Sequence, residues 1–247
     1  MSEKIKIKDN INFLENPNWV ATKRNISSSV FIKSEKGLYE INSQEELPSL
    51  FDKIVLYCLL YLLSKQKDKN DFLITTRYEI AKNVFSQNKN FSQSKYSRIM
   101  LSLKKWHSIT IEFKGCFLEN GDNLDKKFNI IDDFHLDSDN KLIIKLNEKY
   151  LEQLETASYY KFIDFNEYKS LKRPIANRLY ELLIKNFEYI WCIDLDELNK
   201  KLGLEIKTFS SQIISLIKPA IEEINKKTSL KIGFYYNKES NTCIFKK

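Results

Sequence analysis

Two stretches of the sequence, 92–105 and 208–218, combine small hydroxyl and amide side chains with cations and contain no acidic residue. Serine and glutamine hydrogen-bond to base edges, arginine can make two such bonds to guanine, and lysine binds phosphate. A plain solvated helix normally mixes glutamate with lysine, so the missing acids favour a surface that meets an anion. The chemistry predicted for both stretches is hydrogen bonding and ion pairing to DNA.

In the first stretch, helical spacing separates an apolar side from a polar side. The residues expected to face inward are Tyr96, Ile99, Met100 and Leu103. The candidate DNA-binding residues are the outward ones: Ser92, Gln93, Ser94, Lys95, Ser97, Arg98, Ser102 and Lys105. Their short polar side chains would let the helix sit deep in the major groove.

The second stretch has the same character. The residues expected inward are Phe209, Ile213, Leu216 or Ile217, and Ala220. The candidate DNA-binding residues are Thr208, Ser210, Ser211, Gln212, Ser215 and Lys218. The far end of this helix, 222–227, mixes acids with lysines, so contact would be confined to the N-terminal turns, as helix-turn-helix geometry expects.

Further cations lie outside these two helices. Lys172 and Arg173, beside Pro174, are predicted phosphate contacts. Lys126 and Lys127 end a predicted wing at 115–127 and could reach the flanking backbone, although surface lysines are equally common without such a role. Arg178 lies within an apolar stripe and is interpreted as a structural ion-pair partner.

Catalytic chemistry finds little support in the residues. Only five glycines are present, and none opens a phosphate-binding loop. His107 and His135 are too far apart for a His-x-His metal pair, and the four cysteines form no CxxC pair. The adjacent Asp132 and Asp133 are typical of a solvated turn. We therefore expect no catalytic residue, no metal site and no cofactor.

The composition is that of a globular protein, with 43% hydrophobic and 30% charged residues among 247. A net charge of +7 favours an anionic partner, although a lysine-rich composition of the kind that AT-rich genes encode weakens this argument. The longest apolar run, 54–63, is about half of a membrane span. The charged N-terminus and scattered cysteines lead us to expect a cytoplasmic protein without a membrane partner.

The elements that would position these residues form a pattern that occurs twice. In each copy an apolar-striped helix, a short strand, a small helix and a serine-rich helix precede two strands, which is the order of a winged helix. The expected fold class is α+β, with two tandem winged-helix domains. The predicted divisions are an arm or strand pair at 1–46, a first winged-helix domain at 47–158 and a second at 159–247.

Individual elements follow from periodicity and breakers. In the first copy the expected helices are 49–65, 77–85 and 92–106, and the expected strands are 72–75, 109–118 and 127–133. In the second they are helices 167–187, 195–202 and 208–227, and strands 191–193, 231–236 and 242–245. Pro174 is expected to kink or restart its helix. The segment 132–164 holds eight acidic residues and four lysines, a balance of −4, and is interpreted as a domain junction or protein-contact face.

Several stretches resemble the plasmid replication initiator proteins of the RepA and iteron-binding Rep type. They are LPSLFDKIVLYCLLYLL at 47–63, KYSRIMLSLKKWHSITIEF at 95–113, and the region 162–236 with its RLYELL and KPAIEEIN segments. The resemblance implies tandem winged helices that bind repeated origin sites in double-stranded DNA, open an AT-rich region and recruit the host replicative helicase or its loader. It also implies a possible self-dimer. Pro174 and the segment 132–164 are not features that the resemblance explains.

The sequence thus predicts a non-enzymatic, sequence-specific replication initiator whose two recognition helices lie in successive major grooves. The nearest alternative is a tandem winged-helix transcriptional repressor without initiator activity. A primase-type or nicking enzyme is a second alternative, and a protein–protein module built on winged helices is a third. The acid-free helices argue against a protein-binding role alone.

Overall fold

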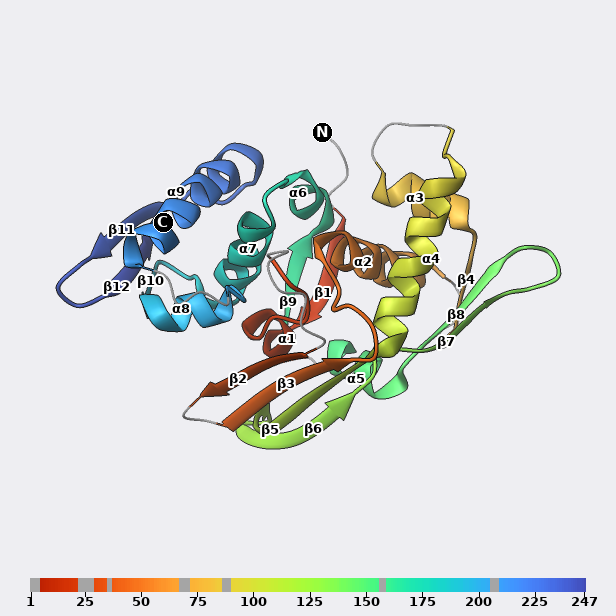
Figure 1. Ribbon diagram of the computed structural model, residues 1–247, viewed down its shortest axis with the longest axis horizontal. Coiled ribbons are helices and arrows are strands. Elements are labelled where there is room, and N and C mark those ends of the chain that lie inside the picture. The colour runs from red at the N-terminus through yellow and green to blue at the C-terminus, as the bar shows by residue number, and fades with distance from the viewer. Residues whose placement is uncertain are drawn as a thin grey trace. The chain divides into compact units, whose positions relative to one another are not determined.

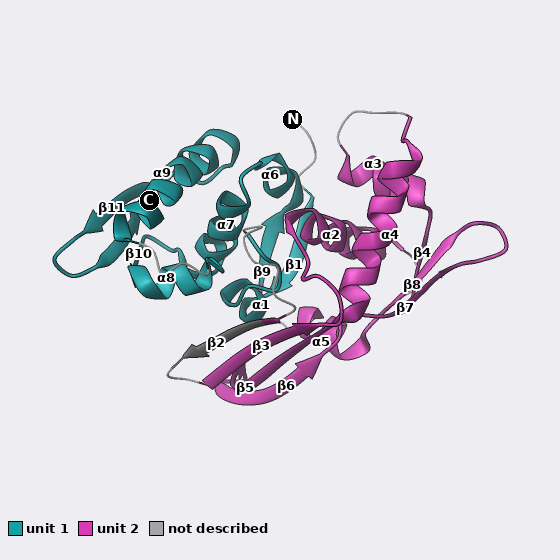
Figure 2. Ribbon diagram, in the orientation of Figure 1, with its two compact units in different colours: residues 1–24, 161–247 teal, residues 25–160 magenta. Residues whose placement is uncertain are grey.

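The structure, a computed structural model, describes residues 5–21, 29–34, 37–66, 72–85, 90–155, 159–204 and 209–247. It divides into two compact units (Figure 2). Unit 2 holds residues 25–160, and unit 1 holds residues 1–24 together with 161–247. The segment 1–46, expected to be one arm, is thus divided between the two units.

Unit 2 contains the first winged helix (Figure 1). Its helices are α2 (Leu50–Lys65), α3 (Arg77–Val84) and α4 (Gln93–Ser108). Its strands are β4 (Phe72–Thr75), β7 (Ile131–Leu136) and β8 (Leu142–Leu146), which form an antiparallel sheet in the order β4-β8-β7. A further helix, α5 (Glu148–Glu155), follows β8.

Local contacts fix where these helices begin and how they pack. The backbone N–H of Ser49 donates to the Asp52 carboxylate at 2.7 Å, so the start of α2 is capped by its own first turn. The hydroxyl of Thr76 accepts a hydrogen bond from the backbone N–H of Glu79 at 3.1 Å and caps the start of α3. The indole of Trp106 is buried and donates to the Asp52 carbonyl at 2.7 Å, which anchors α4 on α2.

The predicted wing at 115–127 is wrong. Its strands, β5 (Ile109–Glu119) and β6 (Asp122–Phe128), belong to a separate four-stranded sheet with β2 (Ser29–Ser34) and β3 (Gly37–Ser43), in the order β2-β3-β5-β6. Ile41 lies opposite Ile111 and Tyr39 opposite Phe113. All four side chains are buried. These side chains of β3 and β5 thus share one buried face of the sheet, whereas a free wing would leave the apolar side of β5 in water.

The wing of the first domain is the β7–β8 hairpin, and it comes from the acid-rich segment. Asp132 and Asp133 lie on β7, and Asp137 and Asp139 lie in the turn that leads to β8. The backbone N–H groups of Asp139 and Lys141 both donate to Asp137 Oδ1, at 2.9 and 2.8 Å, so Asp137 builds the turn. This part of 132–164 lies within unit 2, so its interpretation as a domain junction is wrong, whereas its interpretation as a protein-contact face stays a prediction.

Unit 1 contains the second winged helix. Its helices are α7 (Pro174–Asn186), α8 (Leu195–Lys201) and α9 (Ser210–Lys227), preceded by the short α6 (Phe165–Ser170). Its strands are β10 (Ile190–Asp194), β11 (Gly233–Asn237) and β12 (Thr242–Lys246), in the order β10-β12-β11. This order matches β4-β8-β7 of the first domain. Two tandem winged helices are therefore present, as predicted.

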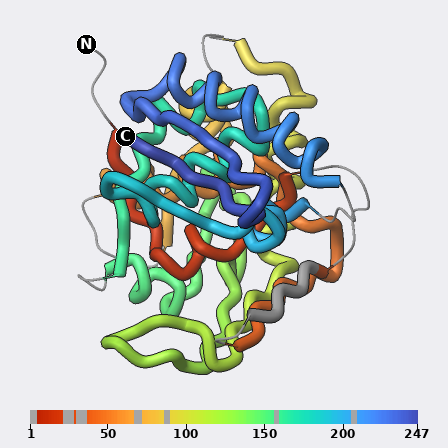
Figure 3. Tube along the Cα trace, turned by 90° about the vertical axis from the view of Figure 1, so that its left-hand side faces the viewer, coloured from red at the N-terminus to blue at the C-terminus, as the bar shows by residue number. Residues whose placement is uncertain are grey.

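Two features of unit 1 concern how its helices are built. Pro174 is the first residue of α7, where its missing N–H costs nothing, so the predicted helix at 167–187 is two helices, and the predicted restart at Pro174 is confirmed. The N-terminal segment supplies β1 (Lys6–Asn10), which pairs with β9 (Tyr160–Asp164), and α1 (Ile11–Glu15). α1 packs on α7. The red N-terminal segment and the blue C-terminal segment can be followed in the side view (Figure 3).

Candidate nucleic-acid interface

The N-terminal half of α4 presents a polar face to solvent. Ser92, Gln93, Ser94, Ser97 and Arg98 are exposed, and Lys95 is partly exposed. The first turn of the helix contains no acid, so no carboxylate neutralises the partial positive charge of its free N–H groups. The N–H groups at this end of α4 can therefore donate hydrogen bonds to phosphate oxygens or to acceptor atoms of the bases.

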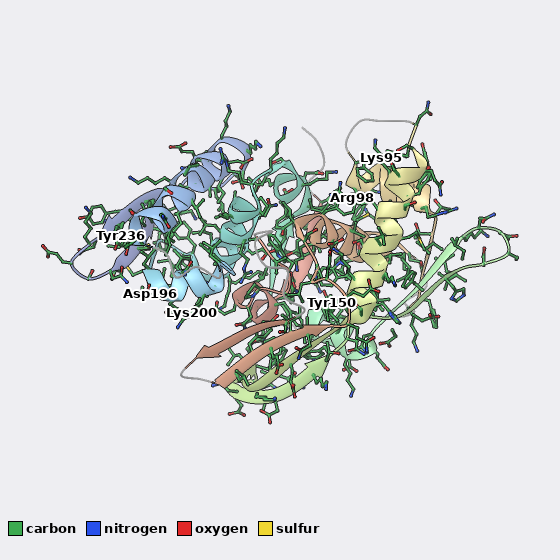
Figure 4. All side chains as sticks on the ribbon, viewed as in Figure 1. Lys95, Arg98, Tyr150, Asp196, Lys200 and Tyr236 are labelled. Carbon is green, nitrogen blue, oxygen red and sulfur yellow. The ribbon has the colours of Figure 1, made fainter. Side chains whose placement is uncertain are left out.

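Aromatic rings hold the two cations of this face. The guanidinium carbon of Arg98 lies 3.7 Å from the ring centroid of Phe51. The ammonium of Lys95 lies 5.3 Å from the Phe85 centroid and 5.4 Å from that of Phe91. Both side chains lie in the same half of α4 (Figure 4). Because cation–π contacts restrict both side chains, less conformational entropy is lost when they bind an anion.

A second basic group supports the same region. The guanidinium carbon of Arg77, the first residue of α3, lies 5.7 Å from the ring centroid of Tyr96 on α4. Tyr78 beside it is 48% exposed. Neither residue was predicted as a DNA contact, although a cation in the first turn of the helix before the recognition helix is a signal visible in the sequence.

Two predicted contacts on α4 are placed differently. Ser102 was expected outward but is fully buried, and its hydroxyl has no hydrogen-bond partner among the described residues. The reason is the phase of the helix: Trp106 is buried with Ile99 and Leu103, which turns Ser102 inward. Lys105 is only partly exposed, and it pairs with Glu46 at 3.0 Å and with Asp52 at 3.7 Å.

The same helix phase exposes an apolar residue that was not among the predicted contacts. Leu101 is 58% exposed on α4. It follows Ser97 by four residues and Arg98 by three, so it shares their face of the helix. The helical spacing of Ser97 and Leu101 could have indicated this position.

Lys126 and Lys127, which were predicted to end the wing of the first domain, lie on β6 of the four-stranded sheet. Lys126 pairs with Glu119 at 3.0 Å across the β5–β6 hairpin. Lys127 is exposed and lies opposite Glu112 in the register. The structure therefore does not bring these lysines into the winged-helix sheet from which they were predicted to reach DNA.

The N-terminal turns of α9 repeat the polar character of α4. Ser210, Ser211, Gln212, Ser215 and Lys218 are all exposed, and the first turn contains no acid. Thr208, the remaining predicted contact, lies outside the described residues. The Ser215 hydroxyl donates to the Gln212 carbonyl at 2.7 Å, which leaves its lone pairs as acceptors.

Phe209 was expected inward, but it is 79% exposed at the N-cap of α9. The buried side of this helix starts at Ile213 and continues through Ile217 and Ala220. The expectation was wrong because an N-cap residue has extended backbone, so helical spacing does not set the direction of its side chain.

Lys172 and Arg173 are exposed just before α7. Their backbone N–H groups donate to the carboxylate of Glu223 on α9, at 2.8 and 3.2 Å. Burial alone would raise the pKa of Glu223, but hydrogen bonds from Lys227 and from these N–H groups lower it. The Arg173 guanidinium lies 3.7 Å from the same carboxylate while its side chain stays 62% exposed, so it is oriented but not enclosed.

Arg178 has no such freedom. It is fully buried and forms an ion pair with Glu181 at 2.6 Å, so its predicted role as a structural ion-pair partner is confirmed.

The part of the chain that the structure describes offers little support for metal, disulfide or membrane chemistry. No group of three or more His, Cys, Asp or Glu side chains there could hold a metal ion. The four cysteines are free thiols. Within the same residues, none of the helices has the length and apolar character needed to cross a membrane.

A family model described as "Replication initiator protein A" matches residues 8–220. The chain belongs to the replication initiator protein A family. The match begins within β1 and ends within α9, so it includes the first winged helix and the second one up to the middle of its recognition helix, without β11 and β12. No curated protein sequence matches the chain.

Solved structures share the fold of this family member. Domains 2 and 3 of RctB match with a TM-score of 0.61 at 15% identity, covering 96% of this chain and 97% of that one. RctB residues 155–483 match with a TM-score of 0.55 at 13% identity, covering 96% of each chain. The Pi initiator protein, solved in complex with iteron DNA, matches with a TM-score of 0.60 at 16% identity, covering 99% of this chain and 97% of that one.

Proposed function

We propose that this replication initiator binds repeated sites in double-stranded origin DNA through the N-terminal turns of α4 and α9. The observation that carries the proposal is that both helices occupy the recognition position of a winged helix and expose an acid-free, hydroxyl- and amide-rich first turn. The Pi initiator, which shares the fold, is described in complex with iteron DNA. Family membership supports origin opening as the outcome of binding.

The two helices contribute unequally in this proposal. α4 carries Lys95 and Arg98 on aromatic supports and supplies backbone affinity. The first two turns of α9 contain no cation before Lys218, and their Ser211 and Gln212 are better suited to choosing between bases. Lys172 and Arg173 add phosphate contacts close to α9, through their link to Glu223.

The wings are not equivalent either. The first wing carries Asp133, Asp137 and Asp139, whose negative charges repel phosphate. The second wing, between β11 and β12, carries Lys238 and Glu239 and is close to neutral. Neither wing is assigned a dominant share of the affinity.

A salt titration tests the proposal. Footprinting on DNA around the chain's own gene locates the site, and fluorescence anisotropy then measures affinity for that duplex and for a scrambled one. If about four or five cations contact phosphate, affinity falls on the order of 10²–10³-fold between about 50 mM and about 200 mM NaCl. Equal affinity for both duplexes, or no dependence on salt, contradicts the proposal.

The protein partners are a second part of the proposal, which family membership supports. We infer that the bound chain recruits the host replicative helicase or its loader, and that it can form a self-dimer. A pull-down of purified helicase by the chain on origin DNA tests the first inference. Sedimentation with and without origin DNA tests the second.

A further inference from the structure

We propose that each recognition helix reads thymine methyl groups through an exposed apolar side chain, Leu101 on α4 and Phe209 at the start of α9. The inference rests on the proposed function, since it concerns the same DNA interface. Leu101 is 58% exposed and Phe209 is 79% exposed. Single exposed leucines are common on protein surfaces. Here, however, a large apolar side chain stands among the polar residues of both recognition helices.

Leu101 lies between two kinds of surface on α4. On its N-terminal side, Ser97 and Arg98 are exposed and available for hydrogen bonding. On its C-terminal side, Lys104 pairs with Glu45 at 2.5 Å, and Lys105 pairs with Glu46. Leu101 itself offers no hydrogen-bonding group, so an apolar feature of the groove is what this position can recognise.

Helix stability does not account for Phe209. The N-cap position favours Ser, Thr, Asp or Asn, whose side-chain oxygen accepts a hydrogen bond from the first turn. Phe209 offers no such bond. Its backbone carbonyl accepts from the N–H of Gln212 at 2.8 Å, so the aromatic ring is carried at a fixed point directly before the serine-rich turn. The N-terminal residues of a recognition helix are those that reach base edges.

The chemistry of the major groove supplies the matching ligand. Thymine presents its O4 acceptor and its C5 methyl group there, and the methyl group is the apolar feature that distinguishes A·T pairs. Removing one buried methyl group weakens binding by about fourfold. Two apolar readers would thus add a preference for thymine that the serine and glutamine contacts do not provide.

Deoxyuridine substitution tests this directly, because uracil keeps every hydrogen-bonding group of thymine and lacks only the methyl group. The full chain is titrated against its footprinted site and against copies in which single thymines are replaced. We expect some replacements to weaken binding by about fourfold. Leu101→Ala should abolish this penalty at one set of positions, and Phe209→Ala should abolish it at another.

Matched controls separate the effect from damage to the protein. Leu136→Ala on the acidic wing and Phe162→Ala on β9 also remove exposed apolar side chains, which are 37% and 45% exposed, and both should keep the full uracil penalty. Thermal unfolding followed by circular dichroism checks that each variant is folded.

The outcomes distinguish the two proposals. Equal affinity of the unaltered chain for the thymine and uracil duplexes overturns the methyl-reading inference and leaves DNA binding standing. A uracil penalty that survives in both Leu101→Ala and Phe209→Ala also overturns it. Failure of the chain to prefer its footprinted site over scrambled DNA overturns both.

Discussion

The guanidinium of Arg178 and the carboxylate of Glu181 form an ion pair, Nη1 to Oε2 2.6 Å, with both side chains buried in unit 1. Three further N–H groups of Arg178 donate to the carbonyls of Leu14, Glu15 and Lys201. Trp19 and Tyr168 donate to Glu181 at 3.1 and 2.7 Å. The pair is thus hydrogen-bonded on both sides, and it ties the N-terminal segment to the second winged helix.

Removing the arginine should destabilise unit 1. Arg178→Ala leaves the Glu181 charge buried without its partner, and we expect a loss of about 3–5 kcal/mol in the free energy of unfolding. Urea unfolding followed by tryptophan fluorescence measures this change. Arg173→Ala, which removes an arginine with a side chain that is 62% exposed, is the matched control and should change the stability by less than about 1 kcal/mol. Similar unfolding midpoints for the two variants would contradict this role of Arg178.

Acid should weaken the same attachment. Burial alone would raise the pKa of Glu15, but the ammonium groups of Lys185 and Lys201 outweigh it and lower the pKa from 4.5 to about 2. A carboxylate with a depressed folded pKa contributes stability that is present above pH 4.5 and is lost as the pH falls toward 2. The contribution is on the order of 3 kcal/mol.

Glu15→Gln checks the pH dependence. Thermal unfolding of the chain and the variant is compared across the acid range. We expect the stability difference between them to be largest near neutral pH and to shrink as the pH falls from 4.5 toward 2. A difference that stays constant over that range would remove Glu15 from the acid transition.

Arg98 should carry much of the DNA affinity of α4. Arg98→Ala removes an exposed cation held over Phe51, and we expect binding of the footprinted site to weaken by about 5- to 100-fold. Lys104→Ala on the same helix removes a cation that is paired with Glu45, so its effect should be about threefold or less. Anisotropy titrations of both variants at one salt concentration decide between them, and equal losses would contradict a special role for Arg98.

Phe51 should act through Arg98. Phe51→Ala removes the ring on which the guanidinium lies, so the arginine becomes mobile and binding should weaken by about threefold to tenfold. In the Arg98→Ala background the same change should have no further effect on DNA binding, since the two residues act as one unit. Additive losses in the double variant would show that Phe51 supports the interface in another way.

The first wing should stay away from phosphate. Asp139 is exposed in the β7–β8 turn and pairs with Lys141 at 3.7 Å. Because its acidic surroundings repel DNA, Asp139→Asn should change affinity by less than about twofold and leave the salt dependence unchanged. A rise in affinity of about fivefold or more would mean that this wing lies against the DNA backbone.

Much of the local structure followed from periodicity and breakers. The spacing of Val55, Leu59 and Leu62 predicted α2, and Pro174 predicted the start of α7. The acid-free first turns of α4 and α9 were visible as composition, because the absence of carboxylates needs no knowledge of tertiary contacts. Helix phase was less certain: Ser102 turned inward because the buried Trp106 sets the orientation of α4.

The sequence by itself determined the two helix-turn-helix cores and the chemistry of their recognition helices, since 3.6-residue periodicity and side-chain type are local properties. Only the tertiary structure decided which strands form each wing and where the N-terminus belongs. β5 pairs with β3, so β8 pairs with β4 in its place, and Trp19 reaches Glu181 across 162 positions of the chain. Strand partners and buried polar contacts depend on which distant apolar surfaces cover one another. The types of neighbouring residues do not determine those long-range contacts.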